Sequence, residues 1–292
     1  MEVTFQMSDV KSIAVIGAGT MGSGIALTAA SSGFNTRLID INQEQVQRAR
    51  GYHAKTLDRN VEKERMTREE ADATLARIEY QDSIASASGS DWGIEAATEN
   101  IEVKKQLFAA MADALDPGAV LATNTSSISI TDIAASVPSA SDRVIGMHFF
   151  NPVPVMKLVE VINGLQTSPE TTERTIALAE SMGKSPIPAN DRAGFVSNRV
   201  LMPMINEAFY AWMEGVAEPE AIDGIMKLGC NFPMGPLRLA DFIGLDVCYH
   251  IMMVLHGELG DQKYFPCPKL HQLVTAGRLG NKTGAGVYDY DK

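Results

Sequence analysis

The chain has 292 residues, of which 45% are hydrophobic and 21% charged, and its formal net charge at pH 7 is −11. The length fits one large or two ordinary globular domains, and the acidic balance argues against a nucleic-acid partner or an anionic membrane surface. Three widely spaced cysteines without a CxxC pattern argue against a disulfide scaffold and a metal site. Since no apolar run reaches about 18 residues and residues 1–11 show no targeting signal, we expect a cytoplasmic protein without a membrane span.

The first elements have the pattern of a dinucleotide-binding unit. A β-branched run, Ser12–Ile16, is followed by three spaced glycines, a helix-compatible stretch and a second strand that ends in Asp40. Gly17 permits the tight turn, Gly19 lets a pyrophosphate approach the backbone, and Gly22 lets the helix pack on the strand. Asp40 would accept hydrogen bonds from the adenosine ribose and repel a 2′-phosphate, which favours NAD over NADP.

Residues 42–78 are strongly charged and follow helical spacing. Thr67 and Glu70 form a capping box that predicts the start of a second helix. A helical hairpin at this point is more than a minimal dinucleotide-binding fold needs. Spacing alone favours a solvated hairpin, and the alternative is a movable clamp whose Arg59 and Lys63 meet an anionic substrate.

Two further predicted strands end in polar residues. The first lies within residues 91–100 and has Glu99 near its polar end. The second, Ala119–Thr123, is followed by Asn124-Thr-Ser-Ser127, which we expect to cap a helix over residues 128–136. Ligands bind at the carboxyl ends of strands in α/β sheets. Glu99, Lys104, Asn124 and Ser127 are therefore candidate rim residues, although capping or turn roles also suit them.

One histidine follows the apolar run Val144–Met147. Pro152 and Pro154 forbid helix and are expected to hold the chain extended as far as a second apolar run, which carries Glu160. A strand, a stiff turn and a strand could bring Glu160 beside His148, where a carboxylate would fix the ring tautomer, as a catalytic base requires. A core histidine satisfied by an acid explains the same stretch, and the residues alone leave both alternatives open.

The second half becomes helical and rich in methionine. After a helix that ends near Met182, residues 184–189 contain two prolines that suit an edge strand. Helices are then expected over residues 195–213, 219–228, 240–255 and 269–276, so we divide the chain into domains 1–190 and 191–292. Several of these helices are almost continuously apolar and would expose more hydrophobic surface than a small monomer should, which predicts dimerisation. Asn198 could reach the strand ends of the first domain or bond its own helix end.

These elements predict an α/β fold, namely a Rossmann-type dinucleotide-binding domain with an inserted helical hairpin, followed by an all-helical dimerisation domain. In this order the segments resemble the 3-hydroxyacyl-CoA dehydrogenase family, most of all its bacterial 3-hydroxybutyryl-CoA branch. The motifs that carry the resemblance are Gly17-Ala-Gly-Thr-Met-Gly-Ser-Gly24, Ile94-Glu-Ala-Ala-Thr-Glu-Asn100, Asn124-Thr-Ser-Ser127, Gly146-Met-His-Phe-Phe-Asn-Pro-Val-Pro154, Gly194-Phe-Val-Ser-Asn-Arg199 and Pro233-Met-Gly-Pro236.

The resemblance implies reversible oxidation of a (3S)-3-hydroxyacyl-CoA with NAD, and a homodimer formed through the helical domain. It implies that His148 is the base, with Glu160 as its partner, and that Ser127 and Asn198 hold the reacting oxygen. The positions that touch NAD in the family are Asp40, Glu99, Lys104, Ser127, Asn151 and Lys282. The candidate contacts to the acyl-CoA substrate are Arg59, Lys63, Ser127 and Asn151. The Lys-Gly-Lys common in the family's hairpin reads Lys63-Glu64-Arg65 here.

Two other functions remain to be separated from this one. A different hydroxyacid or sugar-acid dehydrogenase would use a lysine as base, whereas the candidate here is a histidine. A non-catalytic dinucleotide-binding structural protein would not need the complete set of Ser127, His148, Glu160 and Asn198. Acyl chain length and physiological direction stay open.

Overall fold

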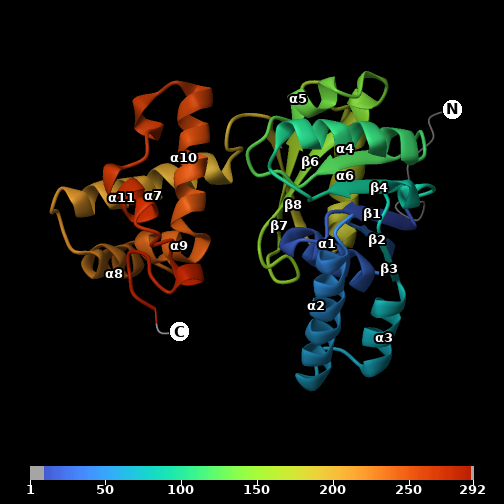
Figure 1. The fold of residues 1–292 in the computed structure, drawn as a ribbon, viewed down its shortest axis with the longest axis horizontal. Helices are drawn as coiled ribbons and strands as arrows, with labels where there is room; N and C mark the ends of the chain where they lie inside the picture. Colours follow the sequence, from blue (N-terminus) through green and yellow to red (C-terminus); the bar gives the residue numbers. More distant parts are fainter. Residues whose placement is uncertain (1–9, 291–292) are drawn as a thin grey trace. The chain divides into compact units, whose positions relative to one another are not determined.

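The computed structural model describes residues 10–290 and divides into two compact units, Met1–Asp191 and Arg192–Lys292. Within the described part of unit 1, the strands form one eight-stranded sheet in the order β3-β2-β1-β4-β5-β6-β7-β8 (Figure 1). The strands are β1 (Ser12–Ile16), β2 (Asn35–Ile39), β3 (Ile78–Gln81), β4 (Trp92–Glu95), β5 (Val120–Thr123), β6 (Val144–Phe149), β7 (Leu158–Asn163) and β8 (Ser185–Asn190).

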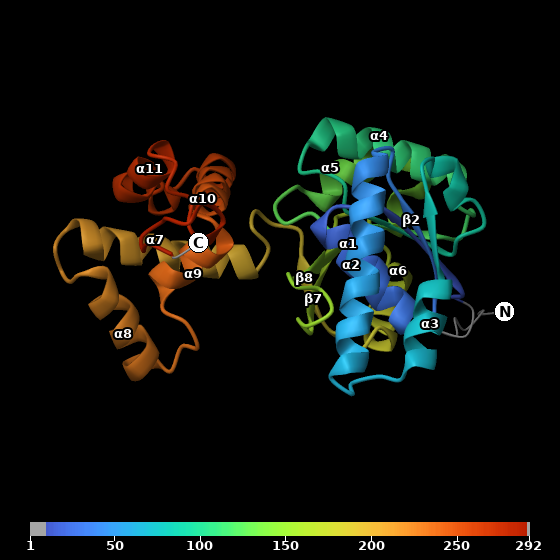
Figure 2. The same ribbon diagram turned by 60° about the horizontal axis from the view of Figure 1, so that its bottom comes forward.

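Neighbouring strands are parallel except for β6 and β7, which pair antiparallel. Helices cover both faces of the sheet (Figures 1 and 2), which explains why the central strands are nearly continuous apolar runs. The helices of unit 1 are α1 (Thr20–Ser31), α2 (Gln43–Glu62), α3 (Arg68–Ala76), α4 (Ile101–Ala114), α5 (Ile130–Ala135) and α6 (Pro169–Ser181). The predicted α/β fold is confirmed, and β8 lies at the sheet edge as expected.

The hairpin of α2 and α3 extends beyond the sheet (Figures 1 and 2). The predicted capping box at Thr67 and Glu70 is present, with reciprocal bonds of 3.1 and 2.7 Å. Close to the sheet, α2 is anchored by His53, which is fully buried. Its Nε2 lies 2.9 Å from the carbonyl oxygen of Ser23, and its Nδ1 lies 2.8 Å from the hydroxyl of Tyr80. Since a carbonyl only accepts, Nε2 carries the hydrogen and Nδ1 accepts from Tyr80.

Unit 2 contains the helices α7 (Ser197–Met213), α8 (Pro219–Cys230), α9 (Pro236–Ile243), α10 (Leu245–Leu259) and α11 (Pro268–Thr275), with a short 3-10 turn, η4 (Gln262–Tyr264). Its core is formed mainly by α7, α9 and α10. In the described residues no single helix is long and apolar enough to span a membrane; α9 and α10 together reach that length and composition, but they are bent by 97°.

Three details differ from the sequence-based expectation. The helix expected over residues 240–255 is two helices, because Gly244 has a φ of 107° and ends α9. The helix expected from residue 128 begins at Ile130, and its cap is Ser129 rather than the segment 124–127. Pro152 and Pro154 do not hold the chain extended. They lie in a turn, in which the carbonyl of Pro152 accepts from the N–H groups of Val155 and Met156, at 2.9 and 3.0 Å.

Candidate active site

The glycine turn after β1 has the space that a dinucleotide phosphate needs. Gly17 has a φ of +103°, and a Cβ there would lie 2.6 Å from the backbone of Ala97. A Cβ on Gly22 would lie 1.8 Å from the carbonyl oxygen of Gly17, whereas one on Gly19 would meet nothing within 4 Å. The first and third glycines are thus required by close backbone packing, and the second leaves an open approach at the N-terminus of α1, which lacks a side-chain cap. These features fit the pyrophosphate of NAD.

Asp40 follows β2 and braces this turn. Its Oδ2 accepts a hydrogen bond from the N–H of Ala18, and its Oδ1 accepts one from the N–H of Asn42, both at 2.8 Å. The carboxylate is therefore held beside the glycine turn, and its contact with a ribose stays a prediction.

A cavity of about 480 Å³ lies between the glycine turn, α2 and the turn after β6. It brings together Gly19 and Asn151, which the sequence placed in one site from distant segments. Three further lining residues, Gln45, Arg48 and Tyr52, were missed by sequence reasoning. The available signal was their spacing of three and four residues, which places them on one face of α2. The complete lining is Ala18, Gly19, Thr20, Ser23, Gln45, Arg48, Ala49, Tyr52, Asn151, Pro152 and Val153.

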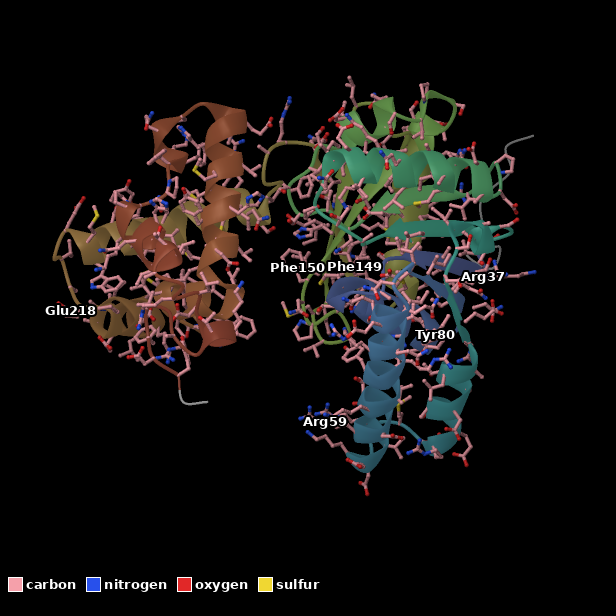
Figure 3. The ribbon with its side chains drawn as sticks, viewed as in Figure 1. Arg37, Arg59, Tyr80, Phe149, Phe150 and Glu218 are labelled. Carbon is pink, nitrogen blue, oxygen red and sulfur yellow. The ribbon has the colours of Figure 1, made fainter. Side chains whose placement is uncertain are left out.

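Arg59 and Lys63 do not line this cavity. Arg59 is in the last turn of α2 and Lys63 is its C-cap. Figure 3 shows Arg59 on the part of α2 that projects away from the sheet, whereas Phe149 and Phe150 lie by the sheet. Both basic side chains are exposed, and their contact with a substrate stays a prediction.

The strand ends of β4 and β5 carry a buried charge network. Glu95 is fully buried, and its Oε2 lies 2.5 Å from the ammonium of Lys104 and 2.8 Å from the hydroxyl of Thr123. Lys104 is itself 1% exposed and lies 3.6 Å from Oε2 of Glu99. The ammonium therefore attracts the carboxylate of Glu99, and the predicted direct contact of Lys104 with NAD stays a prediction.

Glu99 organises the loop that contains Ser127. Its Oε1 accepts from the N–H and the hydroxyl of Ser126, at 2.6 and 2.8 Å, and its Oε2 accepts from the hydroxyl of Thr125 at 2.8 Å. Asn124, in the same loop, accepts from the N–H of Phe149 at 2.9 Å. The loop is thus tied to the strand end that holds His148.

His148 and Glu160 face each other directly in the antiparallel register of β6 and β7. Nδ1 of His148 lies 2.7 Å from Oε2 of Glu160, and both side chains are buried. Because a carboxylate only accepts, the hydrogen of the neutral ring is on Nδ1, and Nε2 carries the lone pair. The ring of Phe150 lies 4.6 Å from the imidazole and limits its movement. The sequence predicted this pairing, and the arrangement is that of an oriented general base.

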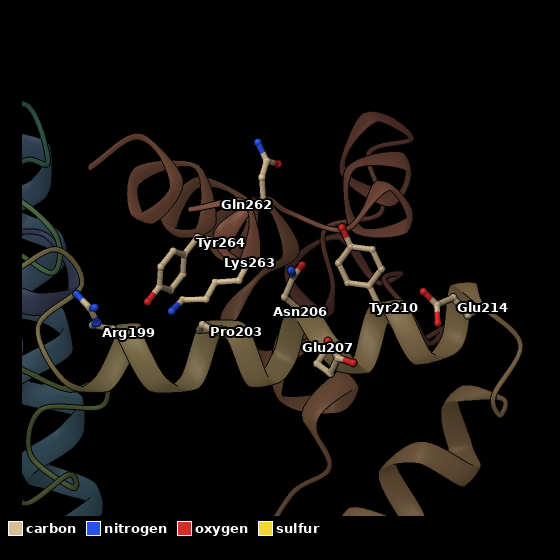
Figure 4. Close-up of a pocket in the computed structure, with 9 residues that line it drawn as sticks. All are labelled: Arg199, Pro203, Asn206, Glu207, Tyr210, Glu214, Gln262, Lys263 and Tyr264. Atoms are coloured by element: carbon tan, nitrogen blue, oxygen red, sulfur yellow. The ribbon is translucent and has the colours of Figure 1, made fainter. Parts of the chain in front are cut away.

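Two predicted site residues belong to unit 2. Asn198 is in the first turn of α7 and is buried, and Lys282 lies in the tail, where its ammonium pairs with Asp246 at 2.6 and 2.7 Å. The contact of Asn198 with the reacting oxygen of the substrate and that of Lys282 with NAD stay predictions. A hollow of about 700 Å³ in unit 2 runs along α7 beside η4 (Figure 4). It includes Tyr264, whose ring lies near the cations of Arg199 and Lys263, and it contains none of the predicted site residues.

Comparison with known proteins assigns both units. Residues 12–192 match the family model described as "3-hydroxyacyl-CoA dehydrogenase, NAD binding domain", and residues 194–290 match "3-hydroxyacyl-CoA dehydrogenase, C-terminal domain". The chain is 54% identical to the "Probable 3-hydroxybutyryl-CoA dehydrogenase" of Bacillus subtilis over 97% of this chain and 99% of that protein.

Two further similarities cover nearly the whole chain. The "3-hydroxyadipyl-CoA dehydrogenase" of Escherichia coli is 46% identical over 97% of this chain and 60% of its own length. The crystal structure of an (S)-3-hydroxybutyryl-CoA dehydrogenase from Ralstonia eutropha superposes with a TM-score of 0.94 at 48% identity, covering 97% of this chain and 100% of that one. The cofactor of the matched first domain is NAD, and the chain belongs to the 3-hydroxyacyl-CoA dehydrogenase family.

Proposed function

We propose that this protein catalyses the reversible oxidation of a (3S)-3-hydroxyacyl-CoA to the 3-ketoacyl-CoA with NAD. The observation that carries the proposal is the buried hydrogen bond between His148 and Glu160 at the strand ends beside the cofactor cavity. A buried acid–histidine pair suits proton transfer, and bound NAD supplies the hydride acceptor.

In this proposal Nε2 of His148 takes the proton of the substrate hydroxyl. The neighbouring carboxylate of Glu160 stabilises the imidazolium that forms, because the opposite charge is only 2.7 Å away. In the reverse direction the imidazolium returns the proton to the oxygen. Ser127 and Asn198 are proposed to hold that oxygen.

The cofactor and substrate contacts are extensions of the same proposal. The open approach at Gly19 and the bonded carboxylate of Asp40 support a dinucleotide on the glycine turn. Asn151 is supported by its place in the cavity wall. The remaining proposed NAD contacts are Gly17, Gly22, Glu99, Lys104, Ser127 and Lys282, and the proposed contacts to the CoA phosphates are Arg59 and Lys63.

The acyl group is proposed to be 3-hydroxybutyryl, because two relatives that are 54% and 52% identical over 99% of their own length are named "Probable 3-hydroxybutyryl-CoA dehydrogenase". The similarity to a 3-hydroxyadipyl-CoA dehydrogenase makes a longer, acidic acyl group the natural comparison. Initial rates with both acyl-CoA substrates decide between them. A higher kcat/KM for the 3-hydroxyadipyl-CoA would contradict this assignment.

A homodimer through unit 2 is also proposed. Its helices expose large apolar side chains that a monomer would leave in water, among them Ile225 and Leu228 of α8 and Phe242 of α9. Leu228 is 91% exposed. Light scattering should give twice the chain mass for the wild type and a smaller mass for a Leu228→Glu, Phe242→Glu variant. A monomeric wild type would refute the dimer.

The test of the reaction is the oxidation of NADH at 340 nm with acetoacetyl-CoA. His148→Gln should lose at least about 10²-fold in kcat, since general acid–base help is worth about 10²–10⁴-fold, while NADH still binds. The matched control is His250→Gln, which changes an exposed histidine of α10. Glu160→Gln should lose less and shift the pH profile.

A His148→Gln variant that keeps a near-normal rate would refute the catalytic assignment. Turnover of a free hydroxy acid but not of the acyl-CoA would favour another hydroxyacid dehydrogenase. Binding of NADH with no turnover of either substrate would favour a non-catalytic dinucleotide-binding protein.

A further inference from the structure

Lys184 is a buried cation that has no part in the proposed chemistry. Its side chain is 8% exposed, and its ammonium donates to the main-chain carbonyls of Val153 and Met156, the latter at 3.0 Å. In residues 10–290 no carboxylate forms an ion pair with it. A buried ammonium is costly unless it is well hydrogen-bonded, so the two carbonyls are its principal compensation. Burial lowers the pKa of this ammonium.

The backbone on both sides fixes where the lysine points. Gly183, with a φ of +69°, ends α6, and the N–H of Lys184 bonds the carbonyl of Ala179 at 3.0 Å. This is the hydrogen bond that closes a Schellman cap. The next residue, Ser185, donates to the carbonyl of Lys157 at 2.8 Å as β8 begins. The lysine stem is thus held against the turn between β6 and β7.

That turn forms one wall of the cofactor cavity through Asn151, Pro152 and Val153. On its other side, Val153 packs against α1 so closely that a Cβ on Gly24 would lie 2.8 Å from the Cβ of Val153. The turn is therefore held both by an apolar contact with α1 and by the ammonium of Lys184. An uncharged apolar side chain in place of Lys184 would leave the two carbonyls without this donor.

We propose that Lys184 is a positioning residue, whose ammonium fixes the turn of residues 151–156 and thereby holds the cavity wall and the two strands that carry His148 and Glu160. This inference rests on the proposed function, because it assigns the turn a part in the dehydrogenase site. Lys184 is not among the residues proposed to contact NAD or the acyl-CoA. Its effect passes through the main chain of Val153 and Met156.

The test compares Lys184→Met with Lys184→Arg and with the control Lys157→Met. Lys157 is exposed and follows the same turn, so its loss tests the removal of a nearby charge alone. A misplaced wall should lower kcat in Lys184→Met by about 10–10²-fold, the size expected for small displacements of a catalytic group. Lys184→Arg should recover most of this loss, and Lys157→Met should keep the wild-type rate.

Amide hydrogen exchange gives a second readout that does not depend on turnover. The N–H groups of Val155 and Met156 should exchange faster in Lys184→Met than in the wild type, while those of β1 and β4 should not change. NADH affinity, measured by fluorescence, should fall in the same variant and be restored by arginine.

A Lys184→Met protein with wild-type kcat and unchanged exchange in the turn, even with a lower Tm, would overturn the inference. If that variant does not fold, Lys184→Gln replaces it, because its shorter amide cannot reach both carbonyls, and a wild-type kcat there has the same consequence. An inactive wild type would instead refute the proposed function, and faster exchange of the turn in the variant would still show that Lys184 holds it.

Discussion

The end of α2 contains a residue that its backbone conformation does not favour. Glu64 has a φ of 54°, the left-handed region. Its N–H bonds the carbonyl of Val61 and the N–H of Arg65 bonds the carbonyl of Asn60, both at 2.9 Å. These two bonds define a Schellman motif with Glu64 at the position that glycine normally takes.

The same motif recurs in this chain with glycine in that position. Gly33 after α1 and Gly183 after α6 have φ values of +97° and +69° and make equivalent bonds. Holding a side chain in the left-handed region costs about 1–2 kcal/mol. Glycine removes this strain, but it also increases the entropy of the unfolded chain, which lowers the stability by about 0.4–1 kcal/mol. Glu64→Gly should therefore stabilise the protein by about 0.5–1 kcal/mol, a rise in Tm of about 1–4 °C for a unit of this size.

Thermal and urea denaturation, followed by circular dichroism, measure this difference. The control is Glu64→Ala, which keeps the Cβ but removes the carboxylate from the unfavourable C-terminal end of the helix dipole. The gain of glycine over alanine isolates the backbone term. If the two variants are equally stable, the strain assigned to Glu64 is absent. Gly183→Ala should show the reverse sign and lower the Tm.

Three other predictions follow from buried polar groups. Lys104→Met leaves the fully buried Glu95 without its cation and should lower the free energy of unfolding, measured by urea denaturation, by about 3–5 kcal/mol. Adding Glu95→Gln to this variant should restore part of the lost stability. A double variant no more stable than Lys104→Met would contradict the pairing. Burial lowers the pKa of His53 below 6.5, so below that pH the unfolded state takes up protons that the folded state refuses. The contribution of the neutral His53 to the free energy of unfolding should thus be fully present above pH 6.5 and should be lost as the pH drops below it. His53→Gln should remove that part of the pH dependence, and an unchanged slope would show that another group causes it. Asp241 accepts from the N–H groups of Val287 and Tyr288 and from the hydroxyl of Tyr290, so Asp241→Asn should release the tail to trypsin at Arg278 and Lys282. An Asp241→Asn variant that resists trypsin as well as the wild type does would refute this anchoring role.

The sequence predicted those parts of the fold that depend on local patterns. β1, the glycine turn, α1 and the acid after β2 follow from composition and spacing within one short stretch, and the capping box at Thr67 is read from four consecutive residues. The break at Gly244 was missed although glycine was present, because apolar residues on both sides continue the helical spacing.

Contacts made across the sheet could not be read in the same way. Lys184 is bound to carbonyls 28 and 31 positions earlier in the chain, and backbone carbonyls leave no mark in the sequence. The buried pair of Glu95 and Lys104 was also missed, because three acids, Glu95, Glu99 and Glu102, precede Lys104 within nine residues and spacing alone does not choose among them. The lining of the cavity by α2 depends on how the helix rotates against α1, which packing decides.

The antiparallel pairing of β6 and β7 explains why the candidate site lies where it does. Had β6 and β7 been parallel like their neighbours, a crossover helix would separate them and the acid would lie far along the chain from the histidine. The connection over residues 150–157 instead places Glu160 directly opposite His148. A slip of one residue would pair Glu160 with Met147 or Phe149 and turn its carboxylate to the other face of the sheet. The pairing of His148 with Glu160 therefore depends on the register that the turn fixes, which is why the contacts that hold that turn, of Val153 with α1 and of Lys184 with its two carbonyls, bear on the candidate site.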